Sequence, residues 1–371
     1  MSEYQYYEFV AIDRALDEWQ LAELRALSSR ADITPTSFVN TYHWGDLRGD
    51  PRVWMGKYFD AFLYLANWGT GRFMLRLPAA VLDCREAERY CIGDAASVWA
   101  VEDNVVVDLV SMTEDGDDYF DESGEGRLAS IVPARADLAA GDLRMLYLGW
   151  LLCVQQGEAD DGEVEPPVPP GLGSLPASLR ALADLLRLDA DLLDVASDAS
   201  STPAPTEISD MERWVRELPE AEKDALLVAL VRGDDPHLRT TMVRRSRGTP
   251  ENAPGSRTAG ELRGAAATRR GERERAAERE REQQRVERER RAEAARERRL
   301  AAVATEGEGA WQRVGALIAT RKPVEYDAAV ALLQDLRVVD DPAVFGRRIT
   351  DLRAEHGRKP SLMERLERFG M

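Results

Sequence analysis

Residues 62–77 read FLYLANWGTGRFMLRL, in which two runs of aromatic and aliphatic side chains flank a glycine-rich centre. Such runs favour extended strands, and Phe62–Trp68 and Arg72–Leu77 are each long enough to form one. Between them, Gly69-Thr70-Gly71 supplies a turn, because glycine adopts backbone angles that other residues avoid. The stretch therefore predicts a β-hairpin within an α+β N-terminal domain that covers residues 1–157.

The chain on both sides of this hairpin carries further helix and strand patterns. Asp17 is expected to begin a helix, with Gln20 three residues later as its capping-box partner. The run Leu143–Val154 is strongly apolar and predicts a helix that packs across the sheet. A short helix is expected at Asp83–Tyr90, and further strands at Tyr6–Ile12, Phe38–Trp44, Val98–Val101, Val105–Val110 and Leu128–Val132.

Composition divides the rest of the chain into segments. Residues 158–176 are acidic and proline-rich, which predicts an extended linker. Residues 177–240 carry leucines at helical spacing and are expected to be a helical segment, interrupted near Asp189. Residues 241–267 are rich in Ser, Gly, Pro and Asn and are expected to be a disordered linker. An Arg/Glu-rich helix at 268–303 and a helical C-terminal module at 310–371 follow.

The Arg/Glu-rich helix has an unusual composition. From Arg269 to Arg299 the chain is an almost uninterrupted weave of Arg and Glu around a few alanines. These residues form helices readily, and opposite charges three residues apart, such as Glu282 and Arg285, add support. Val286 is the one large aliphatic residue in this stretch, so a dimeric coiled coil is disfavoured. We therefore expect a single charged helix, roughly 54 Å long, that acts as a solvated spacer.

The C-terminal module regains apolar residues at helical spacing. Asp341 followed by Pro342 predicts a helix start, because aspartate caps helices and proline fits their first turn. Ser361 with Glu364 fits a capping box for a last helix. These patterns predict a small all-α module.

Charge is distributed unevenly along the chain. Residues 1–238 contain 19 Lys and Arg against 45 Asp and Glu, a net charge of −26. Residues 239–300 contain 19 Arg against 11 Glu, a net charge of +8. Because an acidic surface repels phosphates, nucleic-acid binding by the front part of the chain is disfavoured.

Cysteine usage and hydropathy bear on cellular location. The three cysteines, Cys84, Cys91 and Cys153, form no Cys-x-x-Cys pair, so free thiols are expected rather than a disulfide framework. No basic segment followed by an apolar run begins the chain, so no secretory signal is expected. The longest apolar stretch, Leu146–Val154, is far shorter than the roughly 20 residues that cross a bilayer. We therefore expect a cytoplasmic protein without membrane contact.

The densest group of reactive side chains lies in residues 42–51, which read YHWGDLRGDP. His43 with Asp46 and Asp50 could form an acid–base pair or half of a metal site. A complete catalytic site would need further partners, such as Asp60 or Asn67, brought in by folding. The alternative interpretation is a strand end and a turn, in which Asp50 is a capping residue.

Two other motifs suggest sites but lack essential residues. Residues 114–126 contain several carboxylates, yet they lack the Asp-x-Asp-x-Asp-Gly order of a calcium loop and are interpreted as a solvated acidic loop. Residues 67–71 contain two glycines but no following lysine, so they are interpreted as a hairpin turn rather than a phosphate loop. We therefore expect no cofactor and no metal.

Two parts of the chain resemble known proteins. The runs YDAAVALLQDLR from Tyr326 and RKPSLMERL from Arg358 are similar to the tail of bacterial proteins that carry a SWIM-type zinc finger. The zinc motif itself, Cys-x-Cys followed by Cys-x-His, is absent, so the resemblance implies neither a metal nor a nucleic-acid role. The N-terminal domain resembles an uncharacterised family of high-GC Gram-positive bacteria, which implies no activity and no site residue.

These observations leave three hypotheses about function. The leading hypothesis is a non-enzymatic scaffold or adaptor that binds protein partners through the N-terminal domain and the C-terminal module. The second is an enzyme whose site lies around His43, Asp46 and Asp50. The third is a nucleic-acid-associated protein that acts through Arg269–Arg299, although the interleaved glutamates and the lack of aromatic residues disfavour it. The sequence leaves the partner and the oligomeric state open.

Overall fold

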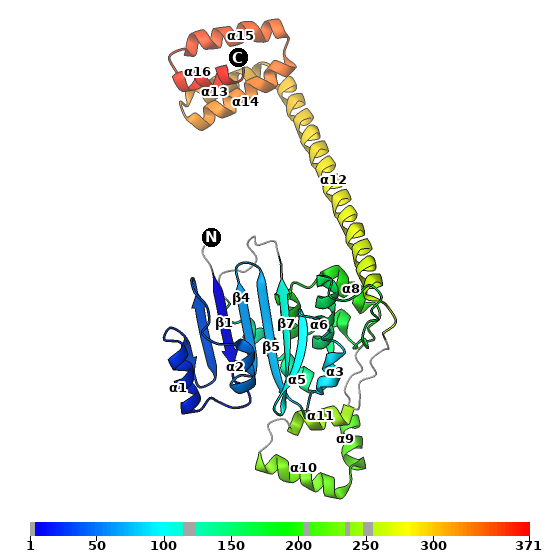
Figure 1. The fold of residues 1–371 in the computed structure, drawn as a ribbon. Coiled ribbons are helices and arrows are strands. Elements are labelled where there is room, and N and C mark those ends of the chain that lie inside the picture. The colour runs from blue at the N-terminus through cyan, green and yellow to red at the C-terminus, as the bar shows by residue number, and fades with distance from the viewer. Residues whose placement is uncertain (1–3, 114–123, 203–207, 234–237, 248–254) are drawn as a thin grey trace. The chain divides into compact units, whose positions relative to one another are not determined.

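The computed structural model describes residues 4–113, 124–202, 208–233, 238–247 and 255–371. The chain divides into two compact units, Met1–Glu272 and Arg273–Met371, which we call the front unit and the back unit. The front unit contains an antiparallel sheet and helices, and the back unit is helical (Figure 1). The predicted fold class, an α+β domain followed by helices that include a long one and a helical C-terminal region, is confirmed.

The front unit is built on one antiparallel sheet, with seven strands in the described residues (Figure 1). The strand order is β2-β3-β1-β4-β5-β7-β6, so the predicted hairpin of β4 and β5 lies near the centre. In this hairpin Phe62 lies opposite Met74, and Leu65 lies opposite Gly71. The strands are Gln5–Val10 (β1), Asp32–Thr34 (β2), Ser37–Tyr42 (β3), Ala61–Ala66 (β4), Thr70–Pro78 (β5), Ala96–Val101 (β6) and Asn104–Met112 (β7).

One face of the sheet is covered by two helices, α1 (Glu18–Leu27) and α2 (Pro51–Lys57). Phe9, Phe62 and Met74 point to this face and pack in one cluster with buried residues of both helices. Successive residues of a strand point to opposite faces, so their neighbours Leu63 and Phe73 lie in a different core.

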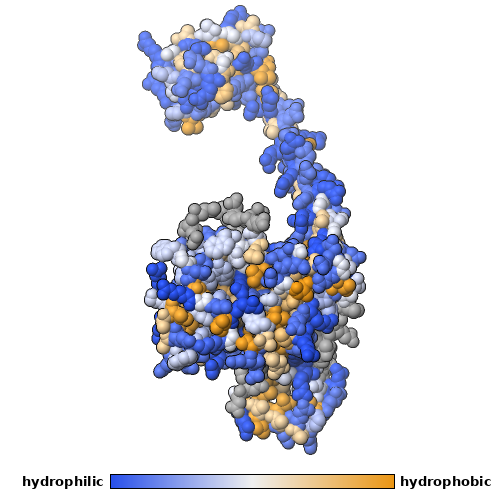
Figure 2. Space-filling view, viewed as in Figure 1, coloured by the Kyte–Doolittle hydropathy of each residue, from blue (hydrophilic) through white to orange (hydrophobic). Residues whose placement is uncertain are grey.

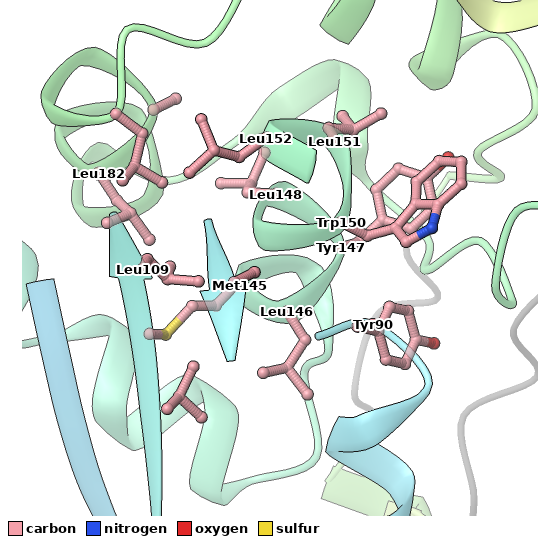
Figure 3. Packing of buried hydrophobic residues seen from close by; sticks show 14 of the residues in the cluster. Tyr90, Leu109, Met145, Leu146, Tyr147, Leu148, Trp150, Leu151, Leu152 and Leu182 are labelled. Carbon is pink, nitrogen blue, oxygen red and sulfur yellow. The ribbon is translucent and has the colours of Figure 1, made fainter. Parts of the chain in front are cut away.

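The opposite face is covered by helices that follow the sheet in sequence. Helix α6 (Arg144–Gln156) confirms the predicted apolar helix and packs on this face. Gly149 allows a close approach, because a Cβ atom there would lie 2.8 Å from Leu109 Cδ2. Figure 3 shows Met145 and Leu148 of the same helix near Leu109 of β7. Further helices of this unit are α3 (Cys84–Glu88), α5 (Ala134–Ala139), α7 (Ala177–Leu185), α8 (Ala190–Ser197), α9 (Ile208–Glu217), α10 (Glu220–Arg232) and α11 (Leu238–Arg247).

The predicted cap of the first helix is confirmed. The Gln20 amide N–H donates to Asp17 Oδ1 at 2.8 Å, and the Asp17 amide N–H donates to Gln20 Oε1 at 3.0 Å. This reciprocal pair satisfies two backbone donors that the first turn of a helix leaves free.

One predicted strand is wrong. Residues 128–132 were expected to be extended, but Arg127–Ile131 forms helix α4. Leu128 and Ile131 are both buried, and their spacing of three residues is helical rather than alternating. Gly126, with a φ of 78°, precedes the helix and turns the chain into it. A short apolar run fits a strand or a buried helix equally well, so its pattern alone could not decide.

The front core extends beyond residue 157, where the sequence analysis expected the N-terminal domain to end. Residues 158–176, expected to be a linker, contain the short 3₁₀ helix Leu172–Ser174, and Val168 and Leu175 lie in the same core as α6. The Tyr90 hydroxyl donates to the Pro167 carbonyl at 2.8 Å, which fixes the proline-rich stretch against α3 and its following loop. The apolar residues between the prolines are thus part of the front core.

Helix α12 (Ala259–Glu306) is longer than the expected helix at 268–303. Its first turns are anchored in the front core, where Ala259, Leu262 and Ala266 are buried. The preceding residues, expected to belong to a disordered linker, are held by Arg257, whose guanidinium donates to Glu165 at 2.8 and 2.9 Å. Within the front unit, the beginning of α12 is therefore a packed element.

The back unit is a set of short helices around its own core, as the sequence predicts. The helices are α13 (Glu308–Ala319), α14 (Pro323–Val339), α15 (Pro342–His356) and α16 (Pro360–Arg368). Leu333 and Leu336 of α14 are fully buried in this core, together with Leu362 and Leu366 of α16.

The predicted caps of the back unit have different outcomes. The cap at Asp341 is confirmed, since its carboxylate accepts from the Ala343 amide at 2.9 Å. The cap at Ser361 is wrong: α16 begins at Pro360, so Ser361 lies inside the helix. Its hydroxyl accepts a hydrogen bond from Arg365 at 2.5 Å instead. Proline favours the first helical position, and here it determines the start.

Candidate functional site

The predicted site lies on the loop between β3 and α2. This loop follows Tyr42 and leads to Pro51, and the side chains of His43, Asp46 and Asp50 are exposed. Gly45 within it has a φ of 81°, a backbone conformation that favours glycine. The three candidate residues are thus close in sequence and accessible to solvent.

Asp46 is bound to the sheet rather than to His43. The Tyr7 hydroxyl donates to Asp46 Oδ1 at 2.6 Å, and the Leu47 amide donates to the same oxygen at 2.7 Å. Gln5 reinforces this attachment, since its Nε2 donates to the Gly45 carbonyl at 2.9 Å. The loop is therefore held on the sheet by two side chains of β1.

His43 and Asp50 each have a separate role. Asp50 caps α2, because its carboxylate accepts from the Arg52 amide at 2.8 Å, as the alternative interpretation predicts. The His43 ring lies 6.0 Å from the ring of Tyr4. Among the residues that the structure describes, no hydrogen bond or ion pair joins His43 to Asp46 or Asp50. The loop brings the three together without assembling an acid–base pair.

Asp60, considered as a further catalytic partner, is a structural residue. Its side chain is buried and forms an ion pair with Arg76 at 2.8 Å. It also accepts hydrogen bonds from the amides of Ile12 and Asp13 at 2.6 and 2.9 Å. These contacts connect the beginning of β4 to the residues that follow β1. Both carboxylate oxygens of Asp60 accept hydrogen bonds from other residues of the fold.

Two tyrosines beside the loop were not predicted as site residues. Tyr7 and Tyr64 are 4.7 Å apart between ring centroids, and the Tyr64 hydroxyl donates to Gln5 Oε1 at 3.0 Å. Burial and the hydrogen bond to Asp46 raise the pKa of Tyr7. Burial raises the pKa of Tyr64 to about 12. Both phenols therefore stay protonated near neutral pH and act as hydrogen-bond donors, not as bases.

The thiols are poorly suited to nucleophilic chemistry. Burial raises the pKa of Cys91 and of Cys153 to about 12, which keeps both in the unreactive thiol form. All three cysteines are free. The described residues contain no group of three or more His, Cys, Asp or Glu that could hold a metal ion. Most of the acidic stretch at 114–126 lies outside the described residues, which resume at Gly124.

A groove that the sequence analysis missed lies between α2 and the edge strand β6. It has a volume of about 510 Å³, and its lining includes Arg52 and Val53 of α2 and Trp99 and Val101 of β6. The Arg52 guanidinium lies 4.0 Å from the centroid of the Trp99 ring. About 47 residues separate this pair in sequence, so local patterns carry no signal for it.

The Arg/Glu-rich stretch is helical, as expected, and contains ion pairs at the predicted spacing of three residues and also at a spacing of four, which was not predicted. Arg285 contacts Glu282 at 2.7 Å (i,i+3), and Arg291 contacts Glu287 at 2.8 Å (i,i+4). The exposed part of α12 is mainly hydrophilic in the space-filling view (Figure 2). Such exposed pairs contribute little individually.

Comparisons with protein-family models, with curated proteins and with solved structures find no match for this chain. No helix of the described ranges is both long and apolar enough to cross a bilayer.

Proposed function

We propose that this chain is a non-enzymatic cytoplasmic adaptor whose front and back units each bind a protein partner. One observation carries the proposal: a single helix contributes to two separate cores. Leu262 and Ala266 near the start of α12 belong to the front core, and Val303 near its end belongs to the back core. A chain that joins two independently packed units through one helix is suited to connecting two partners.

The front unit supports this proposal through its surface and its candidate site. Trp19 and Trp44 are 65% and 69% exposed, and large aromatic residues are enriched where proteins contact one another. The candidate residues Asp46 and Asp50 are engaged in holding the loop and capping α2. Both carboxylates therefore have structural roles that account for their presence.

The back unit supports it as well. Val324 and Phe369 are 77% and 47% exposed, although the unit has a well-formed core around Leu333. These two exposed side chains are the residues at which we place the contact with a partner of the back unit.

The test is affinity capture from the native host with the full chain and with a chain that ends after Glu272. This truncation preserves Leu262 and Ala266, which a cut after Gly260 would remove from the front core. We expect one partner to be lost on truncation and another to be retained. A full-length chain with Leu333→Asp is the matched control, because a charge at this fully buried position disrupts the back core at unchanged length.

The variant and the truncation should lose the same partner. If all three baits capture the same proteins, the back unit binds nothing and the adaptor proposal fails.

A further inference from the structure

The two edges of the front sheet differ in length and composition. β2, at one edge, has three residues and begins with the charged Asp32. β6, at the other edge, has six residues that read ASVWAV, without a charge or a proline. Short strands, charges and prolines are the usual means by which proteins prevent an edge strand from pairing with another chain. β6 has none of these protections.

The register of β6 leaves backbone groups available at this edge. The Val110 amide donates to the Ala95 carbonyl at 2.8 Å, so these residues form a hydrogen-bonded pair. Because such pairs alternate along an antiparallel ladder, the odd-numbered residues from 97 to 101 direct their backbone groups toward β7. The N–H and C=O groups of Val98 and Ala100 then point away from the sheet. Within the described residues, these groups have no backbone hydrogen bond to another segment.

The groove between α2 and β6 lies beside this edge. Trp99 and Val101 point to the α2 face of the sheet and form one wall, and Arg52 and Val53 form the other. Gly56 lets α2 approach β6 closely, because a Cβ atom there would lie 3.1 Å from Val101 Cγ2. Side chains of a strand paired with β6 that point to the α2 face would lie beside Trp99 and Val101, so the groove can receive them.

The charges in the groove differ in their availability. Lys57 forms an ion pair with Glu23 at 2.9 Å. Arg52 is exposed and stacks on Trp99, and it has no ion-pair partner among the residues that the structure describes. Glu102 lines the end of the groove where β6 stops. An acidic group is thus favoured beside Arg52 and disfavoured beside Glu102.

We infer that β6 binds an extended segment of a partner protein by strand addition, with an acidic side chain of that segment against Arg52. Residues directly opposite each other in a sheet share a face, so the partner residue opposite Trp99 lies beside Arg52. The partner residue opposite Val101 lies two positions away, beside Val53 and Gly56, where an apolar side chain fits. The recognised motif is therefore an acid and an apolar residue separated by one residue. This inference names the partner class of the front unit and rests on the adaptor proposal for its biological use.

The experiment uses a displayed library of random nine-residue peptides, selected on the full chain. Enriched peptides should share an acid and an apolar residue two positions apart. The best peptide is then synthesised with a fluorescent label, and its affinity is measured by anisotropy. Ala100→Pro should weaken it at least about tenfold, because proline removes one hydrogen bond and obstructs the added strand.

Two features keep this test sharp. The Ala100 N–H points away from β7, so proline there leaves the ladder with β7 intact, and circular dichroism should confirm an unchanged fold.

Arg52→Gln, a change on an exposed surface, should weaken the affinity for the acidic peptide about fivefold to tenfold. It should leave the affinity unchanged for the same peptide with its acid replaced by the corresponding amide. Arg14→Gln, at an exposed position outside the groove, is the matched control and should change neither affinity.

Three outcomes would overturn the inference: no enrichment of the motif, unchanged binding to Ala100→Pro, or equal loss for both peptides with Arg52→Gln. A concentration-dependent dimer that disappears with Ala100→Pro would assign the edge to a second copy and would also overturn it. The adaptor proposal is tested separately, because Ala100→Pro should leave capture by the back unit unchanged.

Discussion

Two regions of helix α12 are both helical but lie in different environments. In residues 259–272, Ala259, Leu262 and Ala266 are spaced by three and four residues and are buried in the front core. In residues 273–298 no side chain is buried. Three apolar residues at the right spacing therefore determine where this helix packs, whereas helix propensity alone determines only that it is a helix.

The strongest test of this comparison removes the ion pair that holds the chain just before α12. Glu165 is almost completely buried and is bound by the Arg257 guanidinium and the Tyr147 hydroxyl. Arg257→Ala leaves this carboxylate without its cation, so we expect the front unit to lose about 3–5 kcal/mol of unfolding free energy. Urea unfolding followed by tryptophan fluorescence measures this loss.

Arg281→Ala, in the exposed region of the same helix, is the control for that experiment and should have no measurable effect. Equal effects of the two substitutions would show that the beginning of α12 is not anchored.

A smaller loss is expected from the apolar contact itself. Leu262→Ala removes a fully buried side chain and should cost about 3 kcal/mol. Val286→Ala removes a side chain that is 50% exposed in the middle of the helix and should leave the unfolding midpoint unchanged. Both variants are measured in the same urea titrations. A loss of unfolding free energy for Leu262→Ala but not for Val286→Ala would show that α12 packs at its beginning and not in its middle.

The stability that the ion pair between Glu165 and Arg257 provides should also depend on pH. Burial alone would raise the pKa of Glu165, but hydrogen bonds from Arg257 and Tyr147 outweigh it and hold this pKa below its usual range. A lowered pKa in the folded state adds stability above the unfolded-state value, about 4.3, and this stability is lost as the pH falls through the folded-state pKa. The stability difference between the natural chain and Glu165→Gln should therefore shrink as the pH falls from about 5 through the lowered folded-state pKa. A difference that grows on acidification would contradict this sign.

The smallest effect is expected in the exposed ion pairs. The Glu282 carboxylate and the Arg285 guanidinium contact each other at 2.7 Å but are open to solvent. Glu282→Gln should leave both the unfolding midpoint and the helix content by circular dichroism unchanged at physiological salt. A clear loss of helix content would indicate that this region depends on specific pairs.

Local patterns predicted those parts of the fold that depend on near neighbours. The hairpin around Gly69 and the caps at Asp17 and Asp341 follow from residues within a few positions of each other. The strand expected at 128–132 is a helix, because its burial depends on contacts that a five-residue run does not specify. Residues 158–176, expected to be a linker, are packed. Val168 and Leu175 lie in the front core, and Glu165 pairs with Arg257, about 92 residues later.

The candidate site shows the same limit. His43, Asp46 and Asp50 are adjacent in sequence, and the capping role of Asp50 was visible there. The hydrogen-bond partner of Asp46 could not be predicted from the sequence, because Tyr7 lies on a strand 39 residues earlier. The groove beside β6 also depends on a distant pair, Arg52 and Trp99. Pairings across a sheet are set by the whole topology, so a single sequence carries little signal for them.

The central claim is that the chain holds two separately folded units, each with a core of its own. The most direct test is hydrogen exchange of the full chain with Leu333→Ala, a change at a fully buried position of the back core. We predict faster exchange in α13 to α16 and unchanged protection in β4, β5 and the first turns of α12. Equal loss of protection in the sheet would show that the two units unfold as one and would contradict the account.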